Sequence, residues 1–330
     1  MSAEDFQTQK AVVRAHHGAL AGASPVSVAD ALARHTAPDW LWRGMHPFDV
    51  QHGAEAVASA FWVPFLGALR RVQRREDIFF AGLNEIDGFT SPWVVSMGHL
   101  MGLFDGPWLG IRPTGKLAFL RYAEFHRVEG GRIAETAFFF DIPHLMIQAG
   151  QNPFPPATAA HLVQPGPVGH DGLLRDRQDP AEGRRTLAAI NAMIRDLGTW
   201  QLGLPLEEEL ARSWSPDMIW WGPAGIGATY TIERYARQHA GPIRGAFRDR
   251  TGTGHLARLA EGHFGGFFGW PNFRAVPVGG FMGMPGSTVP GEFRVVDIYR
   301  REGDCLAENW VFIDILHYLK TQSLDVLGRL

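Results

Sequence analysis

The sequence repeats itself, and this repeat limits the possible folds more than any other feature. Residues 134–144 read AETAFFFDIPH, and residues 307–317 read AENWVFIDILH. Upstream of each string, LRYAEFHRVEGGRIAE (120–135) matches FRVVDIYRREGDCLAE (293–308) at the same separation and without a gap. A chain that repeats long strings in this way carries the same fold twice.

Two further matches extend the repeat toward the start of each half. Their order is the same in both halves, and only the loop lengths between them differ. Chance does not readily supply four such matches in order. The strings are GHLMGLF (98–104) with GHFGGFF (262–268), which pairs His99 with His263, and ARHTAPDWLWRG (33–44) with ARSWSPDMIWWG (211–222).

The stretch between the two halves has the composition of a linker. Residues 151–180 are rich in Pro and Gly and show no periodicity. The chain has 330 residues, which is more than one core usually serves, and each half has the size of a typical domain. We therefore predict a first domain at 1–150, a linker at 151–180 and a second domain at 181–330.

Each half begins with helical patterns and continues with strand patterns. AEGRRTLAAINAMIRDLG (181–198) has apolar residues at spacings of three and four, which predicts an amphipathic helix. Later segments are rich in β-branched and aromatic residues, and glycine-containing turns at 128–132 and 301–305 predict hairpins. The order favours an α+β fold with helices on one face of a bent antiparallel sheet.

The composition excludes several classes of protein. Hydrophobic residues make up 45% and charged residues 20%, which is typical of a folded chain. The net charge of -3 and the scattered basic residues argue against a nucleic-acid partner. The single cysteine, Cys305, allows no internal disulfide and fits a reducing compartment. The polar start and the lack of a long apolar run predict a cytoplasmic protein with no membrane partner.

Several motifs in each half resemble a SnoaL-like domain of the nuclear transport factor 2-like superfamily. The resemblance implies two cone-shaped domains, each a bent antiparallel sheet wrapped around helices with an apolar pocket between them. It also implies that the two domains form a pseudo-dimer within one chain. The motifs are Gly98-His99 with Gly102, GIRPTGK (110–116), FHRVEGGRIAE (125–135) and DIPHLMIQAG (141–150), then Gly262-His263, GMPGST (283–288), IYRREGDCLAE (298–308) and DILHYLKTQS (314–323).

The resemblance also suggests an activity. The family includes polyketide cyclases, and its relatives include isomerase-like and epoxide hydrolase-like enzymes as well as non-catalytic binding modules. The cyclases carry an acidic residue at the positions of Phe138 and Val311, so this chain departs from their pattern. We favour an enzyme without a cofactor that acts on a small, mainly apolar carbonyl compound by acid–base chemistry. The alternative is a protein that binds a hydrophobic ligand without turnover.

The expected partners follow from this hypothesis. We expect one small apolar molecule as ligand and no nucleic acid. The chain is expected to be a monomer with an internal pseudo-dimer, and a further homodimer is the alternative.

The candidate catalytic residues lie on the predicted strands. Tyr122, Glu124 and His126 alternate along one strand and so share one face. The resembled cyclases have a pocket histidine at the position of Glu124, which implies that Glu124 and its counterpart Asp297 point inward. An apolar pocket would raise the pKa of such a carboxyl group and suit it to proton transfer. The alternative is a salt-bridged residue of the sheet.

The remaining candidates each have a structural alternative. His99 and His263 are predicted to transfer protons or bind a carbonyl group, or else to be core histidines bonded to the backbone. The predicted substrate-binding residues are aromatic or acidic: the aromatic ones can equally fill a core, and the acidic ones can cap a helix. No metal site is expected. The predicted substrate-binding residues are Trp42, Tyr122, Phe138, Asp141, Trp220 and Asp314.

Overall fold

The computed structural model describes residues 5–199 and 203–330; residues 1–4, the start of the polar N-terminal stretch, lie outside them. By internal contacts the chain divides into two compact units. The first unit comprises Met1–Pro153, Val168–Arg177 and Asp325–Leu330, and the second comprises Phe154–Pro167 and Gln178–Leu324. The expected linker at 151–180 is thus shared between the units, and the last residues belong to the first unit.

Two short segments complete the first unit from far along the chain. Leu173 forms a parallel bridge with Phe79, whose amide donates to the carbonyl oxygen of Gly172 over 2.8 Å. Leu330 lies so close to Gly110 that an added Cβ there would be 2.8 Å from the Leu330 Cβ atom. These contacts explain why the first unit includes residues 168–177 and 325–330 in addition to the N-terminal part of the chain.

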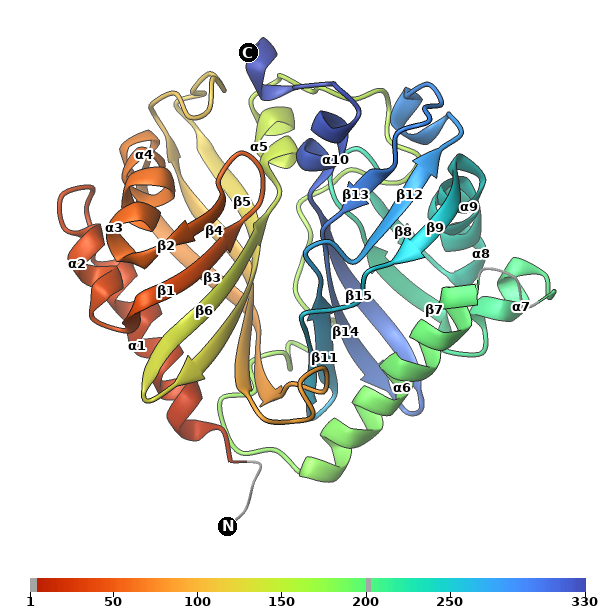
Figure 1. Ribbon diagram of the computed structural model, residues 1–330, viewed down its shortest axis with the longest axis horizontal. Coiled ribbons are helices and arrows are strands. Elements are labelled where there is room, and N and C mark those ends of the chain that lie inside the picture. The colour runs from red at the N-terminus through yellow and green to blue at the C-terminus, as the bar shows by residue number, and fades with distance from the viewer. Residues whose placement is uncertain (1–4, 200–202) are drawn as a thin grey trace. The chain divides into compact units, whose positions relative to one another are not determined.

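The first unit is a six-stranded sheet with helices, in strand order β2-β1-β6-β5-β4-β3 (Figure 1). The helix α1 packs across β3, β4, β5 and β6. The elements are α1 (Gln7–Ala21), α2 (Val28–Ala33), β1 (Thr36–Gly44), β2 (Asp49–His52), α3 (Gly53–Val57), the π-helical turn η1 (Ala58–Trp62), α4 (Val63–Ala68), β3 (Leu69–Leu83), β4 (Pro92–Phe104), β5 (Leu117–Glu129), β6 (Arg132–Phe140), α5 (Ile142–Gln148) and η4 (Leu327–Arg329).

The second unit repeats this plan, with a sheet in the order β10-β11-β14-β15-β7-β8. The helix α6 packs across β10, β11, β14 and β15, as α1 does in the first unit. The elements are α6 (Pro180–Thr199), α7 (Leu206–Leu210), β7 (Trp214–Trp221), β8 (Ala228–Tyr230), α8 (Ile232–Tyr235), η2 (Ala236–Ala240), α9 (Gly241–Ala246), β9 (Phe247–Gly252), β10 (Ala257–Glu261), β11 (Phe264–Phe268), β12 (Phe273–Pro277), η3 (Phe281–Gly283), β13 (Gly291–Phe293), β14 (Val295–Glu302), β15 (Cys305–Ile313) and α10 (Ile315–Thr321).

The predicted α+β fold class is confirmed, and one pairing in each six-stranded sheet is parallel. Strand β1 runs parallel to β6 and β7 runs parallel to β15, while the other pairs are antiparallel. The register places Glu124 opposite Phe138 and Asp297 opposite Val311. Asp297 therefore occupies in the second sheet the position that Glu124 occupies in the first. The pseudo-dimer stays a prediction.

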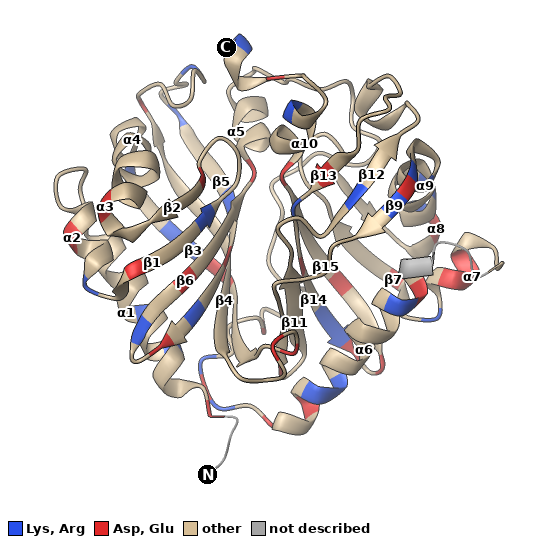
Figure 2. Ribbon diagram, in the orientation of Figure 1, with Lys and Arg blue, Asp and Glu red and all other residues tan. Residues whose placement is uncertain are grey.

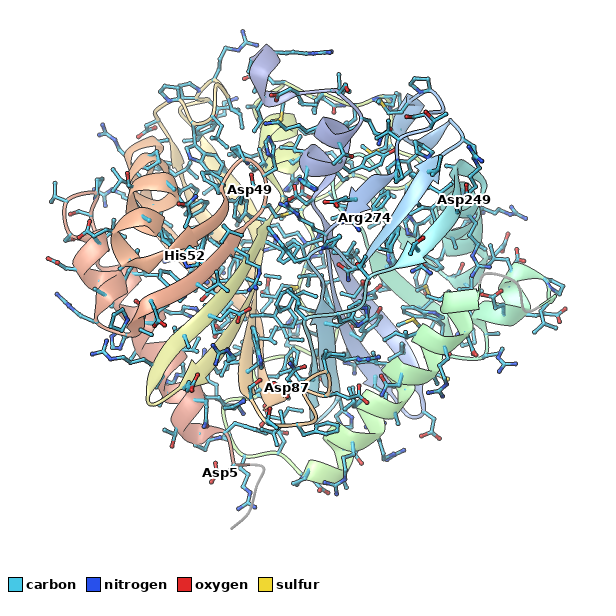
Figure 3. The ribbon with its side chains drawn as sticks, viewed as in Figure 1. Asp5, Asp49, His52, Asp87, Asp249 and Arg274 are labelled. Atoms are coloured by element: carbon cyan, nitrogen blue, oxygen red, sulfur yellow. The ribbon has the colours of Figure 1, made fainter. Side chains whose placement is uncertain are left out.

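The second sheet is interrupted where the first is continuous. The first unit has the long strands β3 and β4, whereas the second unit has the pairs β9/β10 and β11/β12. Strands β9 and β12 do not belong to the six-stranded sheet and pair with β13 in a separate three-stranded sheet, in the order β13-β12-β9. Arg274 on β12, labelled in Figure 3, forms an ion pair with Glu292 on β13 at 2.6 Å. The two copies thus differ most on this side of the sheet.

Asp141 and Asp314 cap the helices α5 and α10, as the alternative interpretation predicted. A side-chain oxygen of Asp141 accepts a hydrogen bond from the His144 amide at 3.0 Å, and Asp314 does the same with the His317 amide at 3.2 Å. Both carboxylates are buried. Their positions are explained by the unsatisfied amides of a helix N-terminus, so the substrate-binding role predicted for them gains no support.

Loss of either cap should destabilise the protein. We expect Asp141→Ala and Asp314→Ala each to lower the free energy of unfolding by about 0.5–2 kcal/mol more than the matched Asn variants, because Asn keeps an acceptor for the helix amide and Ala does not. Both kinds of variant also remove the charge that faces the buried Arg121 or the partly buried Arg294, so the Asn variants are destabilised as well and the difference isolates the cap. Denaturation in urea measures these effects. Equal losses for the Ala and Asn variants would contradict the capping role.

Charged residues are distributed as the composition suggested. Figure 2 shows basic and acidic residues interspersed along the elements of each unit, without a block of one sign. None of the helices in residues 5–199 and 203–330 is long and apolar enough to cross a membrane.

Candidate functional site

Glu124 of the first unit lies in a buried network of charged and polar groups. Arg74 on β3 donates to Glu124 Oε2 at 2.6 Å and to Oε1 at 3.4 Å. His17 on α1 places Nε2 3.1 Å from the same Oε2 atom, and His126 on β5 places Nε2 3.5 Å from it. Glu124 is only 2% exposed. The alternation of β5 predicted that Glu124 and His126 share a face, and this is confirmed.

The pKa of Glu124 is shifted in the direction opposite to the one predicted. Burial alone would raise this pKa, but the positive charge of Arg74 and the neighbouring imidazoles outweigh burial and hold it well below its usual range. Glu124 is therefore ionised at neutral pH and cannot serve as a proton donor there. The salt-bridged alternative describes Glu124, and the prediction of a raised pKa in an apolar pocket is wrong for this residue.

Further polar side chains extend the network on both sides of Glu124. Tyr122 lies beneath Arg74, whose guanidinium carbon is 4.4 Å from the ring centre, and its hydroxyl is 3.0 Å from the Ser96 hydroxyl. His126 Nδ1 is 2.9 Å from the Thr136 hydroxyl. Tyr122 thus supports the charged network and is buried completely.

Aromatic rings fill the region of the first unit where a substrate pocket was predicted. Trp42 and Phe138 are 1% and 0% exposed, and their ring centres are 6.2 Å apart. Phe61 packs between them at 5.9 Å from Trp42 and 5.2 Å from Phe138. The predicted role of Trp42 and Phe138 in binding substrate is replaced by a role in the core, the commoner use of large aromatic residues.

His99 lies on the opposite face of the sheet from Glu124. In the β4/β5 pairing, Ser96 faces Glu124 and His99 faces Arg121. Side chains alternate along a strand, so His99 and Glu124 cannot enter one cavity. The His99 ring packs edge-on against Phe119, and its Nδ1 is 3.4 Å from Asp77. His99 and Glu124, each predicted to be catalytic, therefore do not share one active site.

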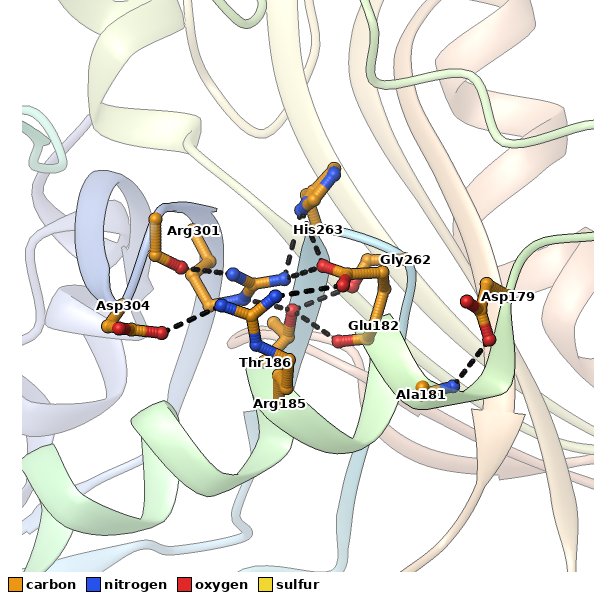
Figure 4. Close-up of polar contacts among 10 residues, drawn as sticks. Asp179, Ala181, Glu182, Arg185, Thr186, Gly262, His263, Arg301 and Asp304 are labelled. Atoms are coloured by element: carbon orange, nitrogen blue, oxygen red, sulfur yellow. Dashed lines mark hydrogen bonds and ion pairs between the residues drawn. The ribbon is translucent and has the colours of Figure 1, made fainter.

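His263 lies in the turn between β10 and β11, at the surface of the second unit. Its side chain is 53% exposed. Arg301 donates to its Nδ1 at 3.0 Å, and Glu182 lies 3.5 Å from the same atom. Figure 4 shows these residues in a network with Arg185 and Asp304. The predicted catalytic role of His263 is not supported, because its half-exposed side chain lies beside the ion pair of Arg301 and Glu182 and lines no described cavity.

Asp297 has a different environment from its counterpart Glu124. Asn309 on the neighbouring strand donates to it at 3.3 Å, and the Tyr299 hydroxyl, two residues along the same face, also bonds to it. Within the described part of the chain it forms no ion pair. Burial raises the pKa of Asp297 to about 7, and the two neutral donors offset only part of this shift. The raised pKa predicted for Asp297 thus matches its surroundings.

Aromatic side chains surround Asp297 and Tyr299. The ring of Tyr299 is 5.8 Å from both Trp214 and Phe267, and Phe267 lies directly opposite Asp297 on β11. Tyr235 is 6.0 Å from Trp214. Burial, together with the negative charge of Asp297, holds the pKa of Tyr299 well above its usual value, so Tyr299 remains a hydrogen-bond donor.

A cavity of about 220 Å³ lies within the second unit near this aromatic group. Most of its lining is apolar, including Ile226, Ile243 and Phe281, and His239 is one of its few polar groups. The His239 ring stacks on Trp220 with the centres 3.8 Å apart. Burial lowers the pKa of His239 to about 3, so it is neutral at physiological pH. Trp220, predicted to bind substrate, is 2% exposed and supports this histidine.

The residues that give Glu124 and Asp297 different environments were not predicted from the sequence. Arg74 and His17 come from β3 and α1, and no pattern around Glu124 points to them. Asn309 was within reach, because it lies in the repeated string AENWVFIDILH where the first copy has Thr136. A comparison of the two copies position by position would have shown that the polar neighbours of Glu124 and Asp297 differ.

The first-unit network also contains a possible metal-binding group. One ligand atom each of His17, Glu124 and His126 lies within 4.8 Å of the others. No metal site was expected from the sequence.

Comparisons with known proteins give structural similarities only. No protein-family model matches the sequence, and no curated protein sequence matches it. A proposed SnoaL-like polyketide cyclase from Jannaschia sp. CCS1 is 18% identical, with 47% of this chain and 98% of that protein covered and a TM-score of 0.36. A proposed polyketide cyclase from Streptomyces antibioticus is 18% identical, with 42% and 99% covered and a TM-score of 0.33. An NTF2-like protein from Burkholderia thailandensis E264 is 22% identical, with 43% and 96% covered and a TM-score of 0.32. Over part of its length, the chain is thus similar to SnoaL-like and NTF2-like proteins.

Proposed function

We propose that the second unit is an acid–base enzyme for a small, mainly apolar carbonyl compound, and that Asp297 moves the proton. The observation that carries this proposal is the contrast between the two copies. Glu124 has an arginine partner at 2.6 Å, whereas the partners of Asp297 among the described residues, at the same sheet position, are the neutral donors Asn309 and Tyr299. A carboxyl group that is not held by a cation is available for proton transfer.

The surroundings of Asp297 suit proton abstraction next to a carbonyl group. An ionised Asp297 would take the proton from carbon, and negative charge would develop on the carbonyl oxygen. Neutral donors placed beside such an oxygen stabilise that charge, and Tyr299 and Asn309 are donors beside Asp297. Because the pKa of Asp297 is about 7, it can also return the proton to a second carbon, as an isomerase or cyclase requires.

The cavity supports a small and mainly apolar ligand. Its volume of about 220 Å³ lies below the 300–1,000 Å³ that is typical of drug-sized ligands. His239 is part of the cavity wall and also stacks on Trp220. The neutral imidazole of His239 would offer one hydrogen bond to a carbonyl group without placing a charge in the cavity.

A second candidate function is ligand binding without turnover. One observation favours it: Asp297 is not among the residues that line the cavity. Mass spectrometry of small molecules that co-purify with the full chain would identify a ligand, and incubation with the enzyme would show whether it is changed. Recovery of an unchanged ligand that fills the cavity would favour this candidate over catalysis.

The pH dependence of proton exchange tests the enzymatic proposal directly. We expect the full chain to catalyse deuterium uptake into cyclohexanone in D2O, with a rate that rises as the pH increases through about 7. The exchange rate should rise with pH because Asp297 must be ionised to accept a proton, and it becomes ionised above its pKa. NMR of the ketone measures the uptake. The control is Asp304→Asn, which alters an exposed carboxylate and should give the same pH profile as the wild type. A wild-type rate that does not depend on pH would contradict the proposal.

A further inference from the structure

We propose that His17, Glu124 and His126 of the first unit form a site for a divalent transition-metal ion, best matched by Zn²⁺. The inference concerns the first unit only and does not rest on the function proposed for the second. The three residues come from α1 and β5, so the site is built from regular elements and not from a loop. Two imidazoles and one carboxylate form a ligand set that zinc uses in proteins.

The distances between the ligand atoms agree with this geometry. Zinc binds nitrogen at about 2.0–2.1 Å and oxygen at about 2.0–2.2 Å, so neighbouring ligands in a tetrahedral site lie about 3.3–3.5 Å apart. Glu124 Oε2 lies 3.1 Å from His17 Nε2 and 3.5 Å from His126 Nε2. The ligand atoms of the three residues lie within 4.8 Å of one another, so one bound ion would draw the two imidazole nitrogens together by at most about 1.5 Å.

A second observation points to a missing partner at this place. His126 is 1% exposed, and its Nε2 atom meets Glu124 Oε2 at 3.5 Å, which is too far for a well-formed hydrogen bond. A buried polar atom without a hydrogen bond costs free energy, and such atoms are uncommon in folded proteins. A metal ion bound to Nε2 would satisfy it.

The other nitrogen of His126 is already held in the way metal sites require, because His126 Nδ1 is 2.9 Å from the Thr136 hydroxyl. Outer partners of this kind fix the orientation of metal-bound histidines. His17 Nδ1 faces Glu76 at 3.6 Å, which is beyond hydrogen-bond distance. The side chains of His17 and Glu76 are 9% and 14% exposed, so the ion would enter from their side.

Arg74 is compatible with the ion. It donates to both oxygens of Glu124, at 2.6 and 3.4 Å. An ionised carboxylate has about four lone pairs, so at least one on Oε2 remains for the metal. The three protein ligands leave the fourth position of a tetrahedral ion open, as in zinc sites that also bind water.

Metal content and thermal stability test the proposal in the intact chain. We expect the chelator-treated protein to bind one Zn²⁺ per chain and its melting temperature to rise with Zn²⁺ concentration. His17→Gln and His126→Gln should each weaken binding by at least about 100-fold, and Thr136→Val, which removes an outer partner, by about 10–100-fold. His52→Gln, at an exposed histidine of the same unit that is labelled in Figure 3, should leave binding unchanged.

A crystallographic measurement keeps the test independent of how the variants fold. In wild-type crystals grown with Zn²⁺, anomalous scattering should place the ion within about 2.0–2.2 Å of all three ligand atoms. An ion found elsewhere, unchanged binding in His17→Gln and His126→Gln, or no binding by the wild type would each overturn the proposal. In the last case the cluster is a hydrogen-bonded network centred on Glu124.

Discussion

Asp297→Asn should lower the rate of proton exchange in the ketone assay by about 10²–10⁴-fold, the usual contribution of a general acid or base. Asparagine keeps the size of the side chain and its acceptor oxygen but cannot accept a proton from carbon. Comparison of the exchange rates of variant and wild type above pH 7 gives the ratio. A variant with the wild-type rate would remove Asp297 from the mechanism.

The same substitution should leave the protein at least as stable as the wild type above pH 7. The pKa of Asp297 is higher in the folded protein than in an unfolded chain, so ionisation of this half-buried carboxyl group opposes folding at high pH. Asparagine removes this penalty. A loss of activity without a loss of stability is the pattern of a catalytic group that the fold holds at some cost. A loss of both would indicate a structural role for Asp297.

Glu124→Gln should show the opposite pattern, with a large loss of stability. The variant leaves Arg74 buried without a counterion, and breaking a buried ion pair on one side costs about 3–5 kcal/mol. Urea denaturation in the presence of a chelator measures the effect without any contribution from bound metal. The proton exchange that we assign to the second unit should be unchanged under native conditions.

Two further variants show whether the loss in Glu124→Gln comes from the unpaired charge. Replacement of both partners, in Arg74→Met with Glu124→Leu, should recover part of the stability, because no charge is then left alone. Glu129→Gln breaks an ion pair with Arg127 that is largely exposed and should change the free energy of unfolding by no more than about 1 kcal/mol. A similar small value for Glu124→Gln would contradict the ion-pair interpretation.

The sequence predicted features that depend on local pattern. Alternation along one strand placed Tyr122, Glu124 and His126 on a common face, and the repeat paired Glu124 with Asp297. The order of strand and helix placed Asp141 and Asp314 at helix N-termini. These features follow from the periodicity of strands and from the unsatisfied amides of a helix, which each short segment carries by itself.

The sequence did not predict features that depend on contacts between distant segments. The pKa of Glu124 is set by Arg74 and His17, which lie 50 and 107 positions away along the chain. The match of His99 with His263 failed for another reason. In the sheets Ser96 faces Glu124 and Phe267 faces Asp297. Ser96 precedes His99 whereas Phe267 follows His263, so the two histidines do not occupy equivalent sheet positions although their strings align in the sequence.

The division of the chain between the two units has a consequence for protein synthesis. Residues 325–330 belong to the first unit, and Leu330 packs against Gly110. A ribosome must therefore translate the whole segment 178–324 before the first unit can reach its final packing. At about 5–20 residues per second this delay is roughly 7–30 s. Until then the nascent first unit would expose the surface around Gly110 that residues 325–330 cover in the folded protein.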